Sequence, residues 1–253
     1  MYTLLGIRIF SGSLPDVISL FERWIQQNKK KYVCVTGVHG IVESKQNENV
    51  YQAHVEADLV VPDGMPLVWI GKMSGYHGTQ RIYGPDLFLE TCRRSELKGW
   101  RIFLYGTTLD TLHELIHRLK LLYPKLNIVG SYAPPFRPLT NDEKIYISHL
   151  IDSARPHIVW VGLSTPKQEL WMHDIHKRLK ANILVGIGAA FDFIAGTKKQ
   201  APHWMRRVGL EWLFRLIQEP RRLGKRYFVN NVRFIHFILK TIVFGEKDYK
   251  IEK

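Results

Sequence analysis

The sequence predicts an α/β fold, in which helices cover a mainly parallel sheet and a basic helical appendage follows it. Three observations predict this. Short, almost continuously apolar runs recur as far as Gly188, stretches with helical spacing separate them, and the strand pattern stops after Gly196. Unbroken apolar runs are typical of strands buried on both faces. Their alternation with helices is typical of parallel sheets, because parallel neighbours need a long return connection.

The elements are predicted in chain order. The N-terminal MYTLLGIRIF has no basic region ahead of a long apolar core, so it predicts a first strand and not a secretion signal. Six further runs are predicted as the buried strands of a Rossmann-like sheet: Tyr32–Gly37, Asp58–Val61, Arg101–Gly106, Asn127–Tyr132, His157–Leu163 and Ile183–Gly188. Between the third and fourth of these runs, one amphipathic helix is predicted from a stripe at helical spacing: Leu112, Leu115, Ile116, Leu119 and Leu122.

Bulk properties limit the class of protein. The 253 residues are 45% hydrophobic, which suits one large core or two closely joined lobes. The predicted boundary divides an α/β core, residues 1–196, from a helical segment, residues 197–253, of two or three helices. No apolar run approaches the roughly 20 residues of a membrane-spanning helix. Cys34 and Cys92 lie in apolar or helical surroundings, which favours core residues in a reducing compartment over a disulfide.

The positive charge is concentrated near the C-terminal end. The chain has a net charge of +13, and residues 197–253 hold 14 Lys and Arg against five Asp and Glu. Tryptophan, tyrosine and phenylalanine side chains are interleaved with these cations. A basic and aromatic surface predicts an anionic partner, which leaves lipid headgroups, a polyphosphate and nucleic acid as alternatives.

Two turns at predicted strand ends carry acidic residues. Asp63 lies between Pro62 and Gly64 after a buried strand, and it is a candidate general base or, alternatively, a turn or helix-capping residue. Arg81 is a candidate for gripping a diphosphate with two hydrogen bonds, or a solvated surface arginine. It precedes a second turn, Gly84–Asp86, in which Asp86 is predicted to cap the following helix. The ends of strands are where open α/β sheets bind their ligands.

Two later segments offer further binding groups. STPKQE, residues 164–169, predicts a helix start with Thr165 and Gln168 as a capping box and Pro166 at its first position. The same helix start suits an anion, with Lys167 adding charge. In GIGAAFDFIAG, residues 186–196, Gly186 and Gly188 permit close approach of a ligand or a helix. Asp192 in that segment is a candidate for a sugar hydroxyl, or else a structural residue.

One motif suggests a metal site. His113-Glu114-Leu115-Ile116-His117 matches the H-E-x-x-H pattern of zinc proteases. Both histidines fall on the polar side of the predicted helix, away from the leucine stripe that faces the sheet. We therefore expect no metal at this position.

Five segments together resemble the WecG/TagA/CpsF family of bacterial glycosyltransferases, glycosyltransferase family 26. They are VPDGMPLVW, RIYGPDL, STPKQE, GAAFDFIAG and APHWMRRVGLEWLFRLIQEPRR, which follow in order over most of the chain. The resemblance implies an inverting, metal-independent enzyme of surface polysaccharide synthesis that needs no cofactor. It implies a UDP-sugar as donor and, as acceptor, a sugar on a polyprenyl diphosphate at the inner face of the cytoplasmic membrane. The enzyme would be cytoplasmic and peripheral on that membrane.

The resemblance also implies roles for residues. Asp63 would be the catalytic base, already ionised near neutral pH, and Arg81 and Gln168 would line the pocket. The C-terminal appendage would associate with the membrane and complete the site. Its Arg215 and Arg222 would close over the leaving diphosphate, with Lys225 at a third position where lysine lacks the fork of an arginine.

One segment departs from the family pattern. Some relatives carry Thr-x-Asn at the strand end where this chain has Val35-Thr36-Gly37, so Thr36 and His39 are the expected substitutes for those polar contacts. A homo-oligomer is possible, because apolar surface beneath the appendage could pair subunits. The rival class is a nucleic-acid- or polyanion-binding module built on the basic segment. That class leaves the turns at Asp63 and Asp86 without a role, and no nucleic acid is expected as a partner.

Overall fold

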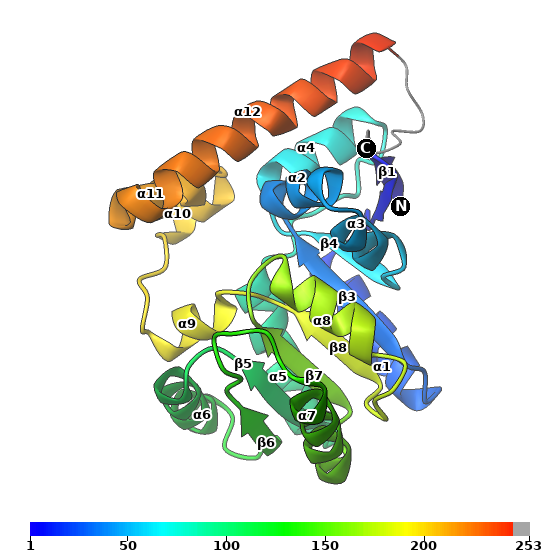
Figure 1. Ribbon diagram of the computed structural model, residues 1–253, viewed down its shortest axis with the longest axis vertical. Helices are drawn as coiled ribbons and strands as arrows, with labels where there is room; N and C mark the ends of the chain where they lie inside the picture. Colours follow the sequence, from blue (N-terminus) through cyan, green and yellow to red (C-terminus); the bar gives the residue numbers. More distant parts are fainter. Residues whose placement is uncertain (245–253) are drawn as a thin grey trace.

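The computed structural model describes residues 1–244 (Figure 1). Its account of side chains leaves out Arg207, Arg222, Lys225, Arg226, Ile242, Val243 and Phe244. The roles predicted for the Arg222 and Lys225 side chains, and the end of the predicted segment 197–253, therefore lie outside the described part.

A six-stranded sheet forms the centre of the fold. Its strands are ordered β4-β3-β8-β7-β5-β6, and every neighbouring pair is parallel. The strands are β3 (Lys31–Thr36), β4 (Leu59–Pro62), β5 (Arg101–Gly106), β6 (Asn127–Tyr132), β7 (Ile158–Gly162) and β8 (Ile183–Gly186). All six predicted runs form strands, and the parallel, helix-covered sheet is confirmed. Five of the strands are almost wholly buried, whereas β6, at the edge of the sheet, is only partly buried.

Helices cover both faces of the sheet. One layer holds α1 (Leu14–Gln26), α5 (Gly84–Lys98), α6 (Leu109–Leu122) and α9 (Ala190–Ala195). The other holds α2 (Val38–Gln46), α3 (Glu48–Val55), α7 (Asn141–Ala154) and α8 (Lys167–Ile175). Strand β3 shows why its run is unbroken: Val33 and Val35 pack into the first layer, whereas Tyr32 and Cys34 pack into the second. Alternate side chains point to opposite faces, so a strand covered twice needs apolar residues throughout.

The two cysteines are core residues, as predicted. Cys34 and Cys92 are both free and fully buried. Burial raises the pKa of each thiol, because the charged thiolate loses its hydration. Neither sulfur is therefore a reactive nucleophile.

The N-terminal segment corrects one prediction. In place of a single strand it forms a hairpin of β1 (Tyr2–Leu4) and β2 (Ile7–Ile9), a two-stranded sheet of its own that packs beside β4. The intervening Leu5 and Gly6 have φ angles of 50° and 82°. Two successive positive φ angles are what a two-residue hairpin turn requires, and they reverse the chain within the apolar run.

Three helices follow the α/β core: α10 (His203–Arg207), α11 (Glu211–Gln218) and α12 (Pro220–Phe244). The prediction of two or three helices after Gly196 is thus confirmed for the described residues. Helix α12, orange to red in Figure 1, packs against α2 and α11. A short helix, α4 (Met65–Met73), follows β4. Among the helices described, none has both the length and the hydropathy to cross a bilayer.

Candidate functional site

A cavity of about 1300 Å³ lies at the carboxyl edge of the sheet. Because all six strands are parallel, the segments that follow them meet at that edge, and each of these segments contributes to the cavity wall. Side chains from α11 and α12 form the rest of the wall, including Glu211, Arg215, Asn230 and Phe234. The site therefore lies where the core and the C-terminal helices meet.

Asp63 sits on this wall directly after β4. Its backbone N–H donates to the carbonyl of Thr36 at 2.9 Å, which extends the β3–β4 pairing by one residue. The helix that follows, α4, is capped by Gly64 with no side-chain bond, so Asp63 is not the cap of that helix. The backbone N–H of Gly84, the first residue of α5, helps to lower the pKa of the Asp63 carboxyl, and 35% of the side chain stays exposed. A carboxylate placed this way can meet a ligand in the cavity.

Arg81 contacts both the backbone and the side chain of Asp63. Its Nε donates to the backbone carbonyl of Asp63, and its Nη2 lies 3.5 Å from Asp63 Oδ1. Its Nη1 donates to the carbonyl of Arg206 at 3.1 Å. The side chain is only 16% exposed, and these donors serve protein groups. Gripping a diphosphate, the role expected of Arg81 from the sequence, stays a prediction.

Three residues that the sequence reasoning missed complete this arrangement: Glu211, Tyr83 and Gln200. Glu211, 9% exposed, accepts from Arg81 Nη2 at 2.7 Å through Oε2, and from the hydroxyl of Tyr83 at 3.2 Å through Oε1. The Tyr83 hydroxyl accepts in turn from Gln200 Nε2 at 3.0 Å. The sequence did offer one signal for Glu211: it is an acidic residue at the start of a strongly amphipathic stretch, two residues after Gly209.

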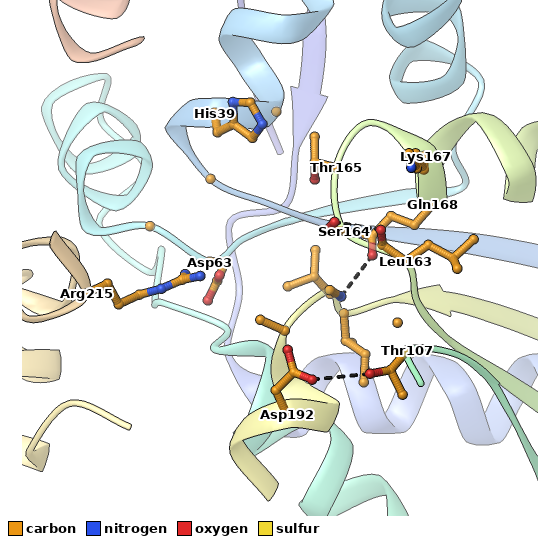
Figure 2. Close-up of a pocket in the computed structure, with 18 of the residues that line it drawn as sticks. His39, Asp63, Thr107, Leu163, Ser164, Thr165, Lys167, Gln168, Asp192 and Arg215 are labelled. Atoms are coloured by element: carbon orange, nitrogen blue, oxygen red, sulfur yellow. Dashed lines mark hydrogen bonds between the residues drawn. The ribbon is translucent and has the colours of Figure 1, made fainter. Parts of the chain in front are cut away.

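The surroundings raise the pKa of Asp63. Burial against the cavity wall is the main cause, and the negative charge of Glu211 adds to it. The cations Arg81 and Arg215 and the N–H of Gly84 oppose it. Figure 2 shows the guanidinium of Arg215 directed toward Asp63. Ionisation of Asp63 near neutral pH stays a prediction; the sequence around Asp63 carries no sign of Glu211 and Arg215, which come from α11, far along the chain.

On the opposite wall, Gln168 joins two segments. It is 2% exposed, its Oε1 accepts from the N–H of Gly188 at 2.8 Å, and its Nε2 donates to Glu169 at 2.9 Å (Figure 2). The predicted capping box does not form. Helix α8 begins at Lys167, and the hydroxyl of Thr165 donates to Glu169 at 2.9 Å instead of receiving a backbone N–H. Lys167 lies at the start of the helix, exposed and lining the cavity.

Asp192 lines the cavity beside Thr107. Its Oδ1 accepts from the Thr107 hydroxyl at 3.2 Å, and Lys198 Nζ lies 3.1 Å from its Oδ2 (Figure 2). Thr107, which directly follows β5, was not predicted. These groups can accept and donate hydrogen bonds to hydroxyls of a sugar or ribose.

The two expected substitutes for Thr-x-Asn differ in position. His39 lines the cavity, and its Nδ1 lies 2.7 Å from the amide nitrogen of Asn230 on α12. Thr36 does not line the cavity, which corrects the prediction. Its side chain is 2% exposed and bonds His54 Nε2 at 3.0 Å inside the fold. The alternation of side chains along β3 turns Thr36 away from the site.

The Gly84–Asp86 turn is also placed differently from the prediction. Helix α5 starts at Gly84 itself and has no side-chain cap, so Asp86 lies inside the first turn. Asp86 is exposed, 3.6 Å from Arg206, and neither it nor Gly84 lines the cavity. Gly84 contributes through its N–H to Asp63.

The H-E-x-x-H segment lies elsewhere, on α6. Its histidines His113 and His117 are exposed, and Glu114 pairs with Arg118 at 2.8 Å. Across residues 1–244, no three His, Cys, Asp or Glu side chains are grouped so as to hold a metal ion.

Comparison with known proteins agrees with the sequence resemblance. The family described as Glycosyl transferase WecG/TagA/CpsF matches residues 2–248 of this chain. Two relatives are both named N-acetylglucosaminyldiphosphoundecaprenol N-acetyl-beta-D-mannosaminyltransferase. The first, from Bacillus spizizenii strain W23, is 29% identical over 90% of this chain and 87% of its own length. The second, from Bacillus subtilis strain 168, is 27% identical over 87% of this chain and 84% of its own length. The chain belongs to the WecG/TagA/CpsF family, and it is a glycosyltransferase.

Proposed function

We propose that this member of the WecG/TagA/CpsF family moves a sugar from a UDP-sugar to a hydroxyl of a glycan carried on a polyprenyl diphosphate, with inversion at the anomeric carbon. The observation that carries the proposal is Asp63, a partly exposed carboxylate with a raised pKa on the wall of a large cavity. The names of the two relatives support a lipid-linked N-acetylglucosamine as acceptor and N-acetylmannosamine as the sugar transferred.

Asp63 would act as general base. A carboxylate oxygen takes the proton of the acceptor hydroxyl while that oxygen attacks the anomeric carbon from the side opposite the UDP. The bond from the anomeric carbon to the diphosphate breaks, and its electron pair leaves with UDP. A raised pKa makes Asp63 a stronger base than an ordinary aspartate.

The departing diphosphate would be stabilised by cations of the protein, without a metal. Arg215, Lys167 and Lys198 line the cavity around Asp63 and Asp192. The start of α8 at Lys167 adds the positive end of a helix dipole. Cations that are positioned before the reaction stabilise charge as it develops in the transition state. Arg222 and Lys225 are proposed to add to this set, as the family resemblance implies.

The size of the cavity suits two substrates. Pockets for one small ligand typically have volumes of about 300–1000 Å³, and this cavity measures about 1300 Å³. Its wall carries polar groups on the Gln168 and Asp192 side as well as at Asp63. We assign the former side to the donor and the region between Asp63 and α12 to the acceptor.

Helix α12 would hold the enzyme on the cytoplasmic face of the membrane. Its exposed side carries an apolar stripe of Phe228, Val232, Ile235 and Leu239, and Arg221 and Arg233 are exposed on the same helix. An amphipathic helix with apolar and basic side chains binds the surface of an anionic bilayer. A lipid-linked acceptor would then meet the cavity beside α12. The same exposed residues could pair two copies of the chain, and vesicle flotation together with light scattering distinguishes membrane binding from dimer formation.

Replacing the proposed base tests the function. We expect Asp63→Asn to keep the fold and to lower turnover by about a hundredfold or more, the scale of lost acid–base catalysis. UDP release is measured with UDP-N-acetylmannosamine and an N-acetylglucosamine linked to a short prenyl diphosphate. Other UDP-sugars are screened in the same assay.

A matched control is Asp110→Asn, the same change at an exposed position on α6. It should leave turnover unchanged. Near-normal turnover by Asp63→Asn would refute the role of Asp63. Absence of UDP release with every UDP-sugar, by a wild-type protein of proven fold, would refute the proposed reaction.

A further inference from the structure

The contacts of Glu211 join α11 to the proposed base. The carboxylate is almost fully buried, yet both oxygens are used: one accepts from Arg81 at 2.7 Å and the other from Tyr83 at 3.2 Å. Arg81 reaches Asp63 twice, through its backbone carbonyl and through Oδ1 at 3.5 Å. A chain of contacts thus runs from α11 through one guanidinium to the carboxylate on the cavity wall.

Arg81 lies closer to Glu211 than to the carboxylate of Asp63. Its Nη2 lies 2.7 Å from Glu211 but 3.5 Å from Asp63, so the closer pair is with Glu211. A guanidinium that is fully engaged by one carboxylate pulls less strongly on a second. Asp63 is therefore held near Arg81 without a close, bidentate pair, and its oxygens remain available to a hydroxyl.

We propose that Glu211 is a positioning residue for the transfer reaction: it draws Arg81 away from a close pair with Asp63 and so leaves the base both aligned and reactive. The proposal rests on the proposed function, in which Asp63 takes the acceptor proton. Glu211 itself has no part in bond making. It acts through Arg81, and its own place is secured by Tyr83 and Gln200.

The charged groups that face Asp63 determine the expected pH effect. They are Arg81, from the segment before α5, and Glu211 and Arg215, from α11. Glu211 raises the pKa of Asp63, and the two arginines lower it. Removing the charge of Glu211 leaves both arginines unopposed, so the pKa of Asp63 falls. The acid limb of kcat/KM reports ionisation of the free enzyme's base, and it should move to lower pH.

The test is Glu211→Gln, which keeps the size of the side chain and removes its charge. We expect kcat/KM on the plateau to fall about tenfold, well short of the loss expected for the base itself. We also expect the acid limb to move to lower pH. The profile is measured as UDP release with UDP-N-acetylmannosamine and an N-acetylglucosamine linked to a short prenyl diphosphate, on protein shown by circular dichroism to be folded.

Two further variants separate charge from packing. Tyr83→Phe removes a hydrogen bond to Glu211 but leaves the negative charge of Glu211 in place. We therefore expect kcat/KM to fall slightly and its acid limb to stay at the same pH. Glu114→Gln makes the same exchange as the test variant on the exposed side of α6 and should change neither. The proposal would be overturned by a Glu211→Gln protein whose acid limb of kcat/KM stays at the wild-type pH, whatever the plateau value of kcat/KM.

Failure of this inference can be told from failure of the proposed function. If Asp63→Asn retains turnover, the general base is wrong and the assignment of Glu211 falls with it. If Asp63→Asn is inactive while Glu211→Gln keeps the wild-type profile, only the role of Glu211 is overturned.

Discussion

The α/β core and the helices α10–α12 are held in place by different forces. In the core, large side chains such as Trp160, Phe21 and Phe88 are fully buried in two apolar layers. In α10–α12, the large apolar side chains described as buried are Leu223 and Phe234, whereas others such as Trp204 and Phe228 are exposed. The core is thus stabilised by apolar burial, and the C-terminal helices depend more on a few specific contacts with it.

Those specific contacts lie at the proposed active site. Glu211 bonds Arg81 and Tyr83, and Asn230, 7% exposed, bonds His39. Buried polar groups need such partners, because an unpaired buried group loses its hydration without compensation. One set of bonds thus both attaches the C-terminal helices and shapes the site. A change in how these helices pack on the core should therefore lower turnover before it lowers stability.

A pair of phenylalanine variants tests this contrast, with the largest expected effect on stability. Phe88 packs edge-on against Trp160, with ring centroids 4.8 Å apart. We expect Phe88→Ala to lower the free energy of unfolding by about 3–5 kcal/mol, the range for a phenylalanine lost from a packed core. Phe234→Ala should cost less than half as much, because α12 can resettle on the surface, and should reduce turnover more than stability.

Urea unfolding followed by circular dichroism measures both variants, with UDP release as the second readout. Equal losses of stability for the two variants would contradict the contrast, since α12 would then be as much a part of the core as α5.

The outer face of α12 provides a second test. We expect a triple variant, Phe228→Ser, Val232→Ser and Leu239→Ser, to lose most of its binding to vesicles of anionic lipid, because it removes exposed apolar area opposite the packed side of the helix. None of the three residues lines the cavity, so turnover with a water-soluble acceptor should persist. Flotation with the vesicles measures the binding.

The matched control is Leu121→Ser with Leu122→Ser, which removes exposed apolar residues from the core surface. It should float like the wild type. If the triple variant floats normally but turns a dimer into a monomer in light scattering without vesicles, the face pairs two copies and the membrane assignment is wrong.

The smallest expected effect is a dependence of stability on pH at Asp63. Its pKa in the folded protein is raised above the value of about 3.9 in the unfolded chain. Between these two values the folded state binds more protons, so stability falls as the pH rises through that interval and stays lower above it. Asparagine does not ionise. The stability of Asp63→Asn relative to the wild type should therefore increase from about pH 4 toward neutral pH.

Thermal unfolding of both proteins across that range measures the difference. A difference that is the same at every pH would mean that Asp63 has an ordinary pKa in the folded protein. It would also remove the electrostatic support for Asp63 as an unusually strong base.

Much of the core was predictable from local sequence. Each of the six parallel strands was visible as a separate run, and burial on both faces explains the apolar residues of the five strands other than the edge strand β6. Asp63 was also found locally, because Pro62 and Gly64 mark the end of a strand. The hairpin at Leu5 and Gly6 was missed, since an apolar run does not show a turn made by two positive φ angles.

The site as a whole required the packing of distant segments. Periodicity shows which face of an element is buried, but it carries no information about which distant side chain will meet that face. Glu211 beside Arg81 and Asn230 beside His39 arise from α11 and α12 folding back on the sheet edge, and the raised pKa of Asp63 arises from its burial there and from the charge of Glu211. Local sequence thus accounts for the scaffold and for its acidic turn, whereas the chemistry of that turn depends on contacts made only in the folded chain.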